Sequence, residues 1–231
     1  MVIRHRKPLD AELKLRETGP PRGQTRSAGV LLHGRGKTPH EKIDLAARMQ
    51  VPEFRWVVPE APGGSWYPNR FMEPVESNQP WLDQALAACD RALDEASEDG
   101  RLGPQQLAIV GFSQGACLTT EFVLRYPGRC GTAVIFTGGI AGPSTEHWRH
   151  GPRLDGLRVL LTGSNVDDWV PEERVHETAE ILTSLGADVR LRLYPGRPHV
   201  VSDEELVEAR MLLRQVPQET GRGTTIVGSG S

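Results

Sequence analysis

A serine between two glycines is the residue of this chain best suited to covalent chemistry. The pentapeptide Gly111-Phe112-Ser113-Gln114-Gly115 follows a short apolar run, 107–110, and precedes apolar residues at helical spacing. So tight a turn from strand to helix holds the serine in a strained backbone conformation, and glycine on either side avoids clashes with neighbouring elements. The hydroxyl of Ser113 is then exposed at the carboxyl edge of a sheet. We therefore predict that Ser113 is a nucleophile.

A serine hydroxyl is a poor nucleophile at neutral pH, so Ser113 needs a base, and His199 is the candidate. The base must itself be oriented by a third group. Of the histidines, only His199 follows a late apolar run and directly precedes a predicted helix, in the turn 194–199 with its glycine and two prolines. We predict that His199 accepts the proton of Ser113.

The orienting group is expected to be a carboxylate between the serine and the histidine, because hydrolases with this serine turn carry the three residues in that order. The apolar run 158–161 leads to Asp167 and Asp168, which places both at the carboxyl end of a strand. On spacing alone either carboxylate could serve, and either could instead cap the helix that begins near Pro171. The N–H of Gln114, directly after the nucleophile, is one expected donor to the oxyanion.

Strands that alternate with helices are needed to bring these residues together. Apolar runs predict strands over 28–32, 54–58, 107–110, 133–136, 158–161 and 189–193. Helical spacing predicts helices over 43–49, 80–96 and 171–185, after 114, and from Ser202, which has capping-box spacing to Glu205. The alternation predicts an α/β fold, a mostly parallel central sheet flanked by helices, with the three loops at its carboxyl edge. Residues 1–216 are expected to form a single domain, with 1–25 an N-terminal arm or edge hairpin and 217–231 a flexible tail.

Four motifs in this order resemble the phospholipase/carboxylesterase family of α/β-hydrolases, which includes acyl-protein thioesterases and small bacterial carboxylesterases. They are His33-Gly34-Arg35-Gly36, the serine pentapeptide, Asp167-x-x-Val170-Pro171 and the Pro-Gly-x-x-His of 195–199, and the similarity runs from about residue 30 to 216. Trp66-Tyr67-Pro68 and Pro80-Trp81-Leu82 further resemble a bacterial branch of the family.

The resemblance implies the α/β-hydrolase fold and a catalytic triad of Ser113, Asp167 and His199. Asp167 matches the family's aspartate, and Asp168 stands where the family commonly has proline. The resemblance also implies that the N–H of Arg35 is the second oxyanion donor. Many relatives carry leucine at that position, and we expect the guanidinium to point to solvent, the alternative being contact with an acidic substrate. We expect His33 to pack and form hydrogen bonds rather than act as a second base.

Aromatic side chains in two loops are candidate walls of a substrate pocket. Trp66, Tyr67 and Phe71 lie with Met72 in the irregular segment 60–80, and Trp169 follows the two aspartates. Each could equally anchor the fold. The segment 137–156 is too short for a large lid, so an open site is expected.

Composition excludes several classes of function. The 231 residues carry a formal net charge of -3 and no basic cluster that would indicate nucleic-acid binding. No apolar run has membrane-spanning length and no signal-peptide core follows the basic start, which predicts a cytoplasmic protein. The three cysteines have neither disulfide nor zinc spacing and are predicted to be buried thiols. His147 and His150 lack further ligands at suitable spacing, so we expect no metal and no cofactor.

The sequence thus predicts a serine carboxylesterase that hydrolyses small to medium acyl esters through an acyl-enzyme intermediate. The alternatives are a thioesterase or lysophospholipase with the same triad, and a catalytically silent binding protein on the same fold. The expected partner is a small-molecule ester, and a homodimer is possible.

Overall fold

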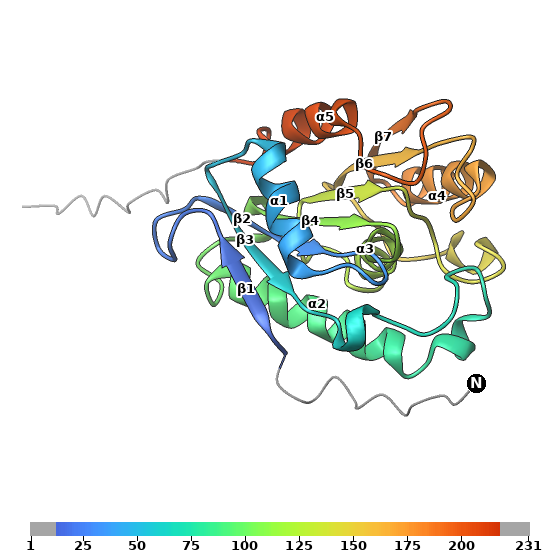
Figure 1. Cartoon of the computed structure of the whole chain (residues 1–231), viewed down its shortest axis with the longest axis horizontal. Helices are drawn as coiled ribbons and strands as arrows, with labels where there is room; N and C mark the ends of the chain where they lie inside the picture. Colours follow the sequence, from blue (N-terminus) through green and yellow to red (C-terminus); the bar gives the residue numbers. More distant parts are fainter. Residues whose placement is uncertain (1–12, 218–231) are drawn as a thin grey trace, which may run out of the picture.

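In the part of the chain that the structure describes, one seven-stranded sheet lies at the centre (Figure 1). The computed structural model describes residues 13–217. The strands are β1 (Leu15–Thr18), β2 (Ser27–Leu32), β3 (Phe54–Pro59), β4 (Leu107–Phe112), β5 (Thr132–Phe136), β6 (Arg158–Gly163) and β7 (Asp188–Leu193). Their order in the sheet is β1-β3-β2-β4-β5-β6-β7, and every pair is parallel except β1 with β3. Parallel pairing brings the carboxyl ends of β2, β4, β5, β6 and β7 to one edge.

Within the described residues, five α-helices cover the two faces of this sheet. They are α1 (Pro39–Met49), α2 (Trp81–Ser97), α3 (Gln114–Arg125), α4 (Glu172–Ser184) and α5 (Asp203–Leu213). Helices α1 and α5 pack on one face, and α2, α3 and α4 on the other (Figure 1). This two-sided cover explains why β2 to β5 are buried along their whole length and read in the sequence as continuous apolar runs.

The apolar stripes of the helices form two cores, one on each face. On α2, Leu82, Ala85, Leu86, Cys89 and Leu93 are buried, as the helical spacing predicts. On α5 the buried residues Leu206 and Leu213 join the core of the opposite face. Strand β7 lies at the edge of the sheet and is only half-buried, and its apolar residues pack against the larger core.

The predicted elements are confirmed, with boundaries that shift by a few residues. The expected N-terminal edge element is strand β1, while residues 1–12 and the tail from 218 lie outside the described part. The segment 137–157 contains one short 3₁₀ turn, Glu146–Trp148, and no larger insertion, in agreement with the absence of a large lid. The three cysteines are buried and unbridged, as predicted. Within residues 13–217, no helix combines the length and apolarity that crossing a bilayer requires.

Candidate active site

The backbone at Ser113 is strained, as the serine turn requires. Ser113 lies between β4 and α3 with φ 56° and ψ -121°, a conformation that residues with a side chain rarely adopt. A Cβ atom on Gly111 would lie 2.2 Å from the carbonyl oxygen of Gly115, and one on Gly115 would lie 2.4 Å from that of Leu32. The two glycines are therefore needed sterically, and they allow the turn to present the serine side chain at the sheet edge.

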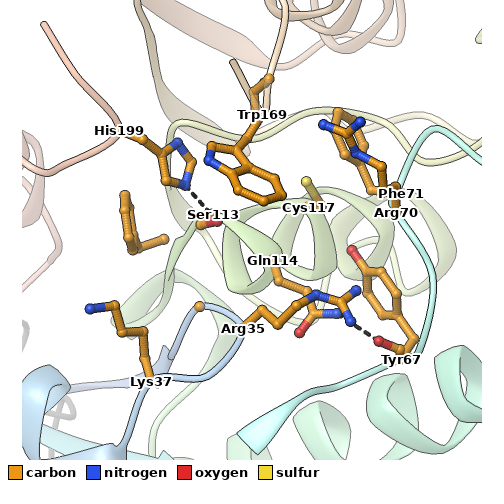
Figure 2. Close-up of a pocket in the computed structure, with 13 residues that line it drawn as sticks. Arg35, Lys37, Tyr67, Arg70, Phe71, Ser113, Gln114, Cys117, Trp169 and His199 are labelled. Atoms are coloured by element: carbon orange, nitrogen blue, oxygen red, sulfur yellow. Dashed lines mark hydrogen bonds between the residues drawn. The ribbon is translucent and has the colours of Figure 1, made fainter. Parts of the chain in front are cut away.

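Three side chains from three loops form one hydrogen-bonded chain. His199 Nε2 lies 2.8 Å from Ser113 Oγ (Figure 2). On the other side of the ring, His199 Nδ1 lies 2.7 Å from Asp167 Oδ2. The other carboxylate oxygen of Asp167 accepts the N–H groups of Trp169 and Val170, each at 2.9 Å. The Asp167 side chain is fully buried. The hydrogen bonds to its two oxygens fix its orientation.

Asp168 has a different environment. Its side chain is exposed, and its backbone carbonyl accepts a hydrogen bond from Arg70 at 3.3 Å. Of the two carboxylates left open by spacing, the structure brings Asp167 to the histidine.

A buried ion pair supports the histidine loop. Arg197 Nε lies 3.3 Å from Glu205 Oε2, and both side chains are buried. Arg197 also donates to Thr137 Oγ1 at 2.7 Å and to the Pro198 carbonyl at 2.8 Å. Glu205 accepts from Thr162 Oγ1 at 2.5 Å and from the Ser202 N–H at 2.8 Å, which completes the predicted capping box. The sequence did not predict this structural role of Arg197. The one indication was a charged residue inside a Pro-Gly turn, shortly before a capping glutamate.

The loop after β2 packs against the serine. A Cβ atom on Gly34 would lie 3.3 Å from the Cβ of Ser113. His33 is fully buried, its Nδ1 donates to the Gly34 carbonyl at 2.9 Å, and its Nε2 accepts the N–H of Ala61 at 3.0 Å. Burial lowers the pKa of His33, which keeps the imidazole neutral in this role. The expectation that His33 packs and forms hydrogen bonds is confirmed.

Arg35 is exposed, as expected, but its guanidinium also contacts a neighbouring loop. It donates to the carbonyls of Pro68 and Asn69, at 2.6 and 2.5 Å, and its central carbon lies 6.0 Å from the centre of the Tyr67 ring. The acceptors belong to a loop more than thirty residues away in the chain. No residue type or spacing indicates this pairing.

A pocket of about 280 Å³ opens beside Ser113 and His199. Of the four predicted aromatic wall residues, Tyr67, Phe71 and Trp169 line it (Figure 2). Tyr67 and Phe71 are buried in its walls, whereas Trp169 is 59% exposed at the mouth.

The prediction for Trp66 is wrong. Its side chain is fully buried, and its indole N–H donates to the His33 carbonyl at 2.8 Å, so it anchors the fold beneath the site. Met72 likewise packs against the core and does not line the pocket.

Other wall residues were not predicted. The pocket is also lined by Gly34, Lys37, Arg70, Phe112, Cys117 and Val170. Cys117 lies one helical turn after Ser113, a spacing that could have found it. Burial raises the pKa of Cys117 to about 12, so it is present as a neutral thiol. The ring of Phe112 lies 5.1 Å from that of His199.

The side chain of Gln114 fixes one wall of the pocket. It is buried, its Oε1 accepts the N–H of Trp66 at 3.0 Å, and its Nε2 donates to the Tyr67 carbonyl at 2.8 Å. The residue after the serine therefore positions the aromatic loop as well as the start of α3. Among residues 13–217, no group of three or more His, Cys, Asp or Glu side chains could hold a metal ion.

Comparisons with known proteins identify relatives of this chain. The model of the family described as Phospholipase/Carboxylesterase matches residues 15–216. A probable carboxylesterase of Oryza sativa subsp. japonica is 28% identical over 79% of this chain and 75% of its own length. Acyl-protein thioesterase 1 of Gibberella zeae is 24% identical over 85% of this chain and 93% of its own.

A solved structure is similar over nearly the whole described chain. The crystal structure of a phospholipase/carboxylesterase from Dyadobacter fermentans superposes with a TM-score of 0.83 at 35% identity, and the match covers 88% of this chain and 97% of that one. The chain therefore belongs to the phospholipase/carboxylesterase family and is a hydrolase of carboxylic esters or thioesters.

Proposed function

We propose that the protein is a serine carboxylesterase in which Ser113, His199 and Asp167 form the catalytic triad. The observation that carries the proposal is the chain of two short hydrogen bonds from Ser113 Oγ through His199 to Asp167. A serine with a partnered imidazole, itself held by a buried carboxylate, has the arrangement that activates a hydroxyl for acyl transfer.

The reaction would proceed in two halves. Ser113 Oγ bonds to the ester carbonyl carbon while His199 Nε2 takes its proton, which gives a tetrahedral oxyanion. The oxyanion collapses, the bond to the alcohol oxygen breaks, and His199 returns the proton to the leaving alcohol. Water, deprotonated by the same imidazole, then cleaves the acyl-enzyme and releases the acid. Because Asp167 accepts a hydrogen bond from the Nδ1–H group of His199, the lone pair of Nε2 faces the serine.

The backbone N–H groups of Arg35 and Gln114 are the proposed donors to the oxyanion. Gln114 is the first residue of α3, where backbone N–H groups have no partner within the helix. Arg35 lies in the loop that packs against Ser113 through Gly34, and both residues line the pocket. Donors fixed in the backbone need no reorganisation as charge develops.

The pocket volume favours small to medium acyl groups. A cavity of about 280 Å³ lies at the low end of the sizes usual for small-molecule pockets. An acyl thioester is a second candidate substrate, because the similarity to an acyl-protein thioesterase favours it. The same triad would serve for either leaving atom.

Active-site labelling tests the proposal and separates it from a silent binding protein. A fluorophosphonate probe should label the wild-type protein, and Ser113→Ala should abolish labelling and hydrolysis together. Ser144→Ala, an exposed serine outside the pocket, is the matched control and should label normally. Rates on acetyl, butanoyl and octanoyl esters beside the matching thioesters would then define acyl length and leaving atom. Labelling that persists in Ser113→Ala would contradict the assignment.

A further inference from the structure

The lining of the active-site pocket is cationic. Among the described residues that form it are Arg35, Lys37 and Arg70, and no Asp or Glu side chain. The rest of the lining is mostly aromatic or aliphatic. A neutral ester forms no ion pair with such cations, whereas an ester that carries an anionic group would.

Arg70 is the cation most available to a ligand. It stacks on the Trp169 ring, 5.3 Å from its centre, and donates to the Asp168 carbonyl at 3.3 Å. It forms no ion pair within residues 13–217, whereas Arg129 and Arg174, for example, each pair with a carboxylate. Its charge is therefore not neutralised by a direct contact in the described chain.

The segment that carries Arg70 is held firmly. Asn78, which is buried, accepts the N–H of Asn69 at 2.8 Å and donates to the carbonyl of Arg70 at 3.2 Å. Arg35 fixes the same segment from the other side through the carbonyls of Pro68 and Asn69. Lys37 adds less positive charge to the pocket than Arg70 does, because Glu41 lies 3.2 Å from its ammonium group. The charge of Arg70 is thus presented on an ordered loop.

The hydroxyl of Tyr67 is a second polar group that a ligand could contact. The side chain is 2% exposed, and among the described residues the hydroxyl has no hydrogen-bond partner of good geometry. The neighbouring thiol of Cys117 is a weak partner at best. Figure 2 shows this hydroxyl pointing into the pocket, on the side where Cys117, Phe71 and Arg70 lie. A buried hydroxyl without a partner is unfavourable, and a ligand oxygen would satisfy it.

Carboxylates near the pocket do not cancel the positive charge of its lining. Asp167 does not line the pocket, and both of its oxygens already accept hydrogen bonds, from His199 and from two backbone N–H groups. Asp168 is exposed and lies outside the lining. Its charge weakens the attraction for an anion without closing the pocket to one.

We propose that the pocket takes esters that carry a second, anionic group, which Arg70 and the Tyr67 hydroxyl bind while Ser113 attacks the carbonyl carbon. This inference rests on the proposed serine esterase function. The anionic group is a carboxylate or a phosphate, and a short apolar spacer between it and the ester packs against Phe71 and Trp169. Charge-assisted hydrogen bonds to arginine are among the stronger contacts available to a ligand.

Matched ester pairs test this inference and locate the anionic group. An anion on the acyl side is tested with monopropyl glutarate against propyl pentanoate. An anion on the alcohol side is tested with 3-(butanoyloxy)propanoate and 3-(butanoyloxy)propyl phosphate, each against butyl butanoate. In at least one pair, kcat/KM for the anionic ester should exceed that for the neutral ester by tenfold or more. Arg70→Gln, which keeps a donor but removes the charge, should reduce this ratio at least tenfold, and Tyr67→Phe should also reduce it.

Arg91→Gln is the matched control, because Arg91 is an exposed arginine of α2 outside the pocket and its loss changes net charge equally. It should leave the ratio unchanged. An enzyme that hydrolyses the neutral esters but prefers none of the anionic ones would overturn the inference and leave the proposed function intact.

A binding measurement decides the inference independently of turnover. In calorimetry with Ser113→Ala, the preferred anionic ester should bind at least tenfold more weakly once Arg70→Gln is added. If no ester is hydrolysed, the proposed function fails, and monopropyl glutarate is titrated instead. Equal affinity of the single and double variants would overturn the inference.

Discussion

Asp167 and Asp168 are neighbours in the chain, yet only Asp167 is buried against the imidazole of His199. Asp167→Asn would place an amide opposite His199 Nδ1 and favour the wrong tautomer of the ring. We expect kcat on a neutral butanoate ester to fall by about a thousandfold or more. Asp168→Asn is the matched control and should keep kcat within about threefold. Steady-state kinetics would check both, and a larger loss in Asp168→Asn would reassign the acid.

Lys42 on α1 is a buried cation whose charge should affect stability. Its ammonium lies 4.9 Å from the centre of the Phe112 ring, and burial lowers its pKa from 10.5 to about 8. The charges near it are Glu41, which favours the ammonium, and Lys37 and Arg48, which oppose it. Between these two pKa values the unfolded chain binds more protons than the folded one, so the free energy of unfolding should rise with pH in that window.

Lys42→Met should therefore be more stable than the wild type at pH 7, by roughly 2 kcal/mol once the lost contact with Phe112 is counted. The difference should shrink as pH rises from 8 towards 10.5, because wild-type Lys42 loses its charge over this range. Urea denaturation of both proteins at several pH values would measure it. A difference that does not change with pH would show that the charge of Lys42 carries no penalty.

The turn between β7 and α5 depends on the ion pair of Arg197 with Glu205. Glu205→Gln would leave a buried guanidinium without its counter-ion, and such losses cost about 3–5 kcal/mol. We expect a lower free energy of unfolding and a kcat that falls more than KM rises, because His199 loses its fixed position. The double variant Arg197→Met/Glu205→Gln should be less destabilised than the sum of its single variants. Additive losses in denaturation experiments would mean that the two residues act separately.

Elements were predictable from the sequence where local pattern decides structure. The apolar runs of β2 to β5 mark strands covered on both faces, and the stripe on α2 marks its buried side. The serine turn was predictable for a related reason, since its glycines are required by contacts within the turn and with the adjoining strand.

Contacts between distant loops were not predictable. Trp66 anchors the fold because its indole N–H donates to a carbonyl of the loop after β2. Arg35 is held because its guanidinium donates to the carbonyls of residues 68 and 69. No residue type or spacing indicates which of two aromatic neighbours, Trp66 or Tyr67, faces the core and which the pocket. These outcomes depend on tertiary packing.

On the scale of the whole molecule, both apolar cores share one sheet, and the site lies along a single edge of it. We propose that residues 15–216 form a single domain. The same strands contribute side chains to both cores, so neither core can form without the shared sheet. The urea denaturation experiments proposed for Lys42→Met also test whether there is one domain. Far-ultraviolet and near-ultraviolet circular dichroism should report the same transition, and two separated transitions would contradict a single domain.

The position of Trp169 has a practical consequence. The residue is 59% exposed at the pocket mouth, whereas Trp56 and Trp66 are at most 2% exposed and Trp81 and Trp148 are partly buried, so Trp169 is the most exposed of the five tryptophans. A molecule that fills the pocket must displace solvent from this ring and should shift its fluorescence emission. The protein therefore carries an intrinsic optical reporter of occupancy, which can be read in Ser113→Ala without any turnover.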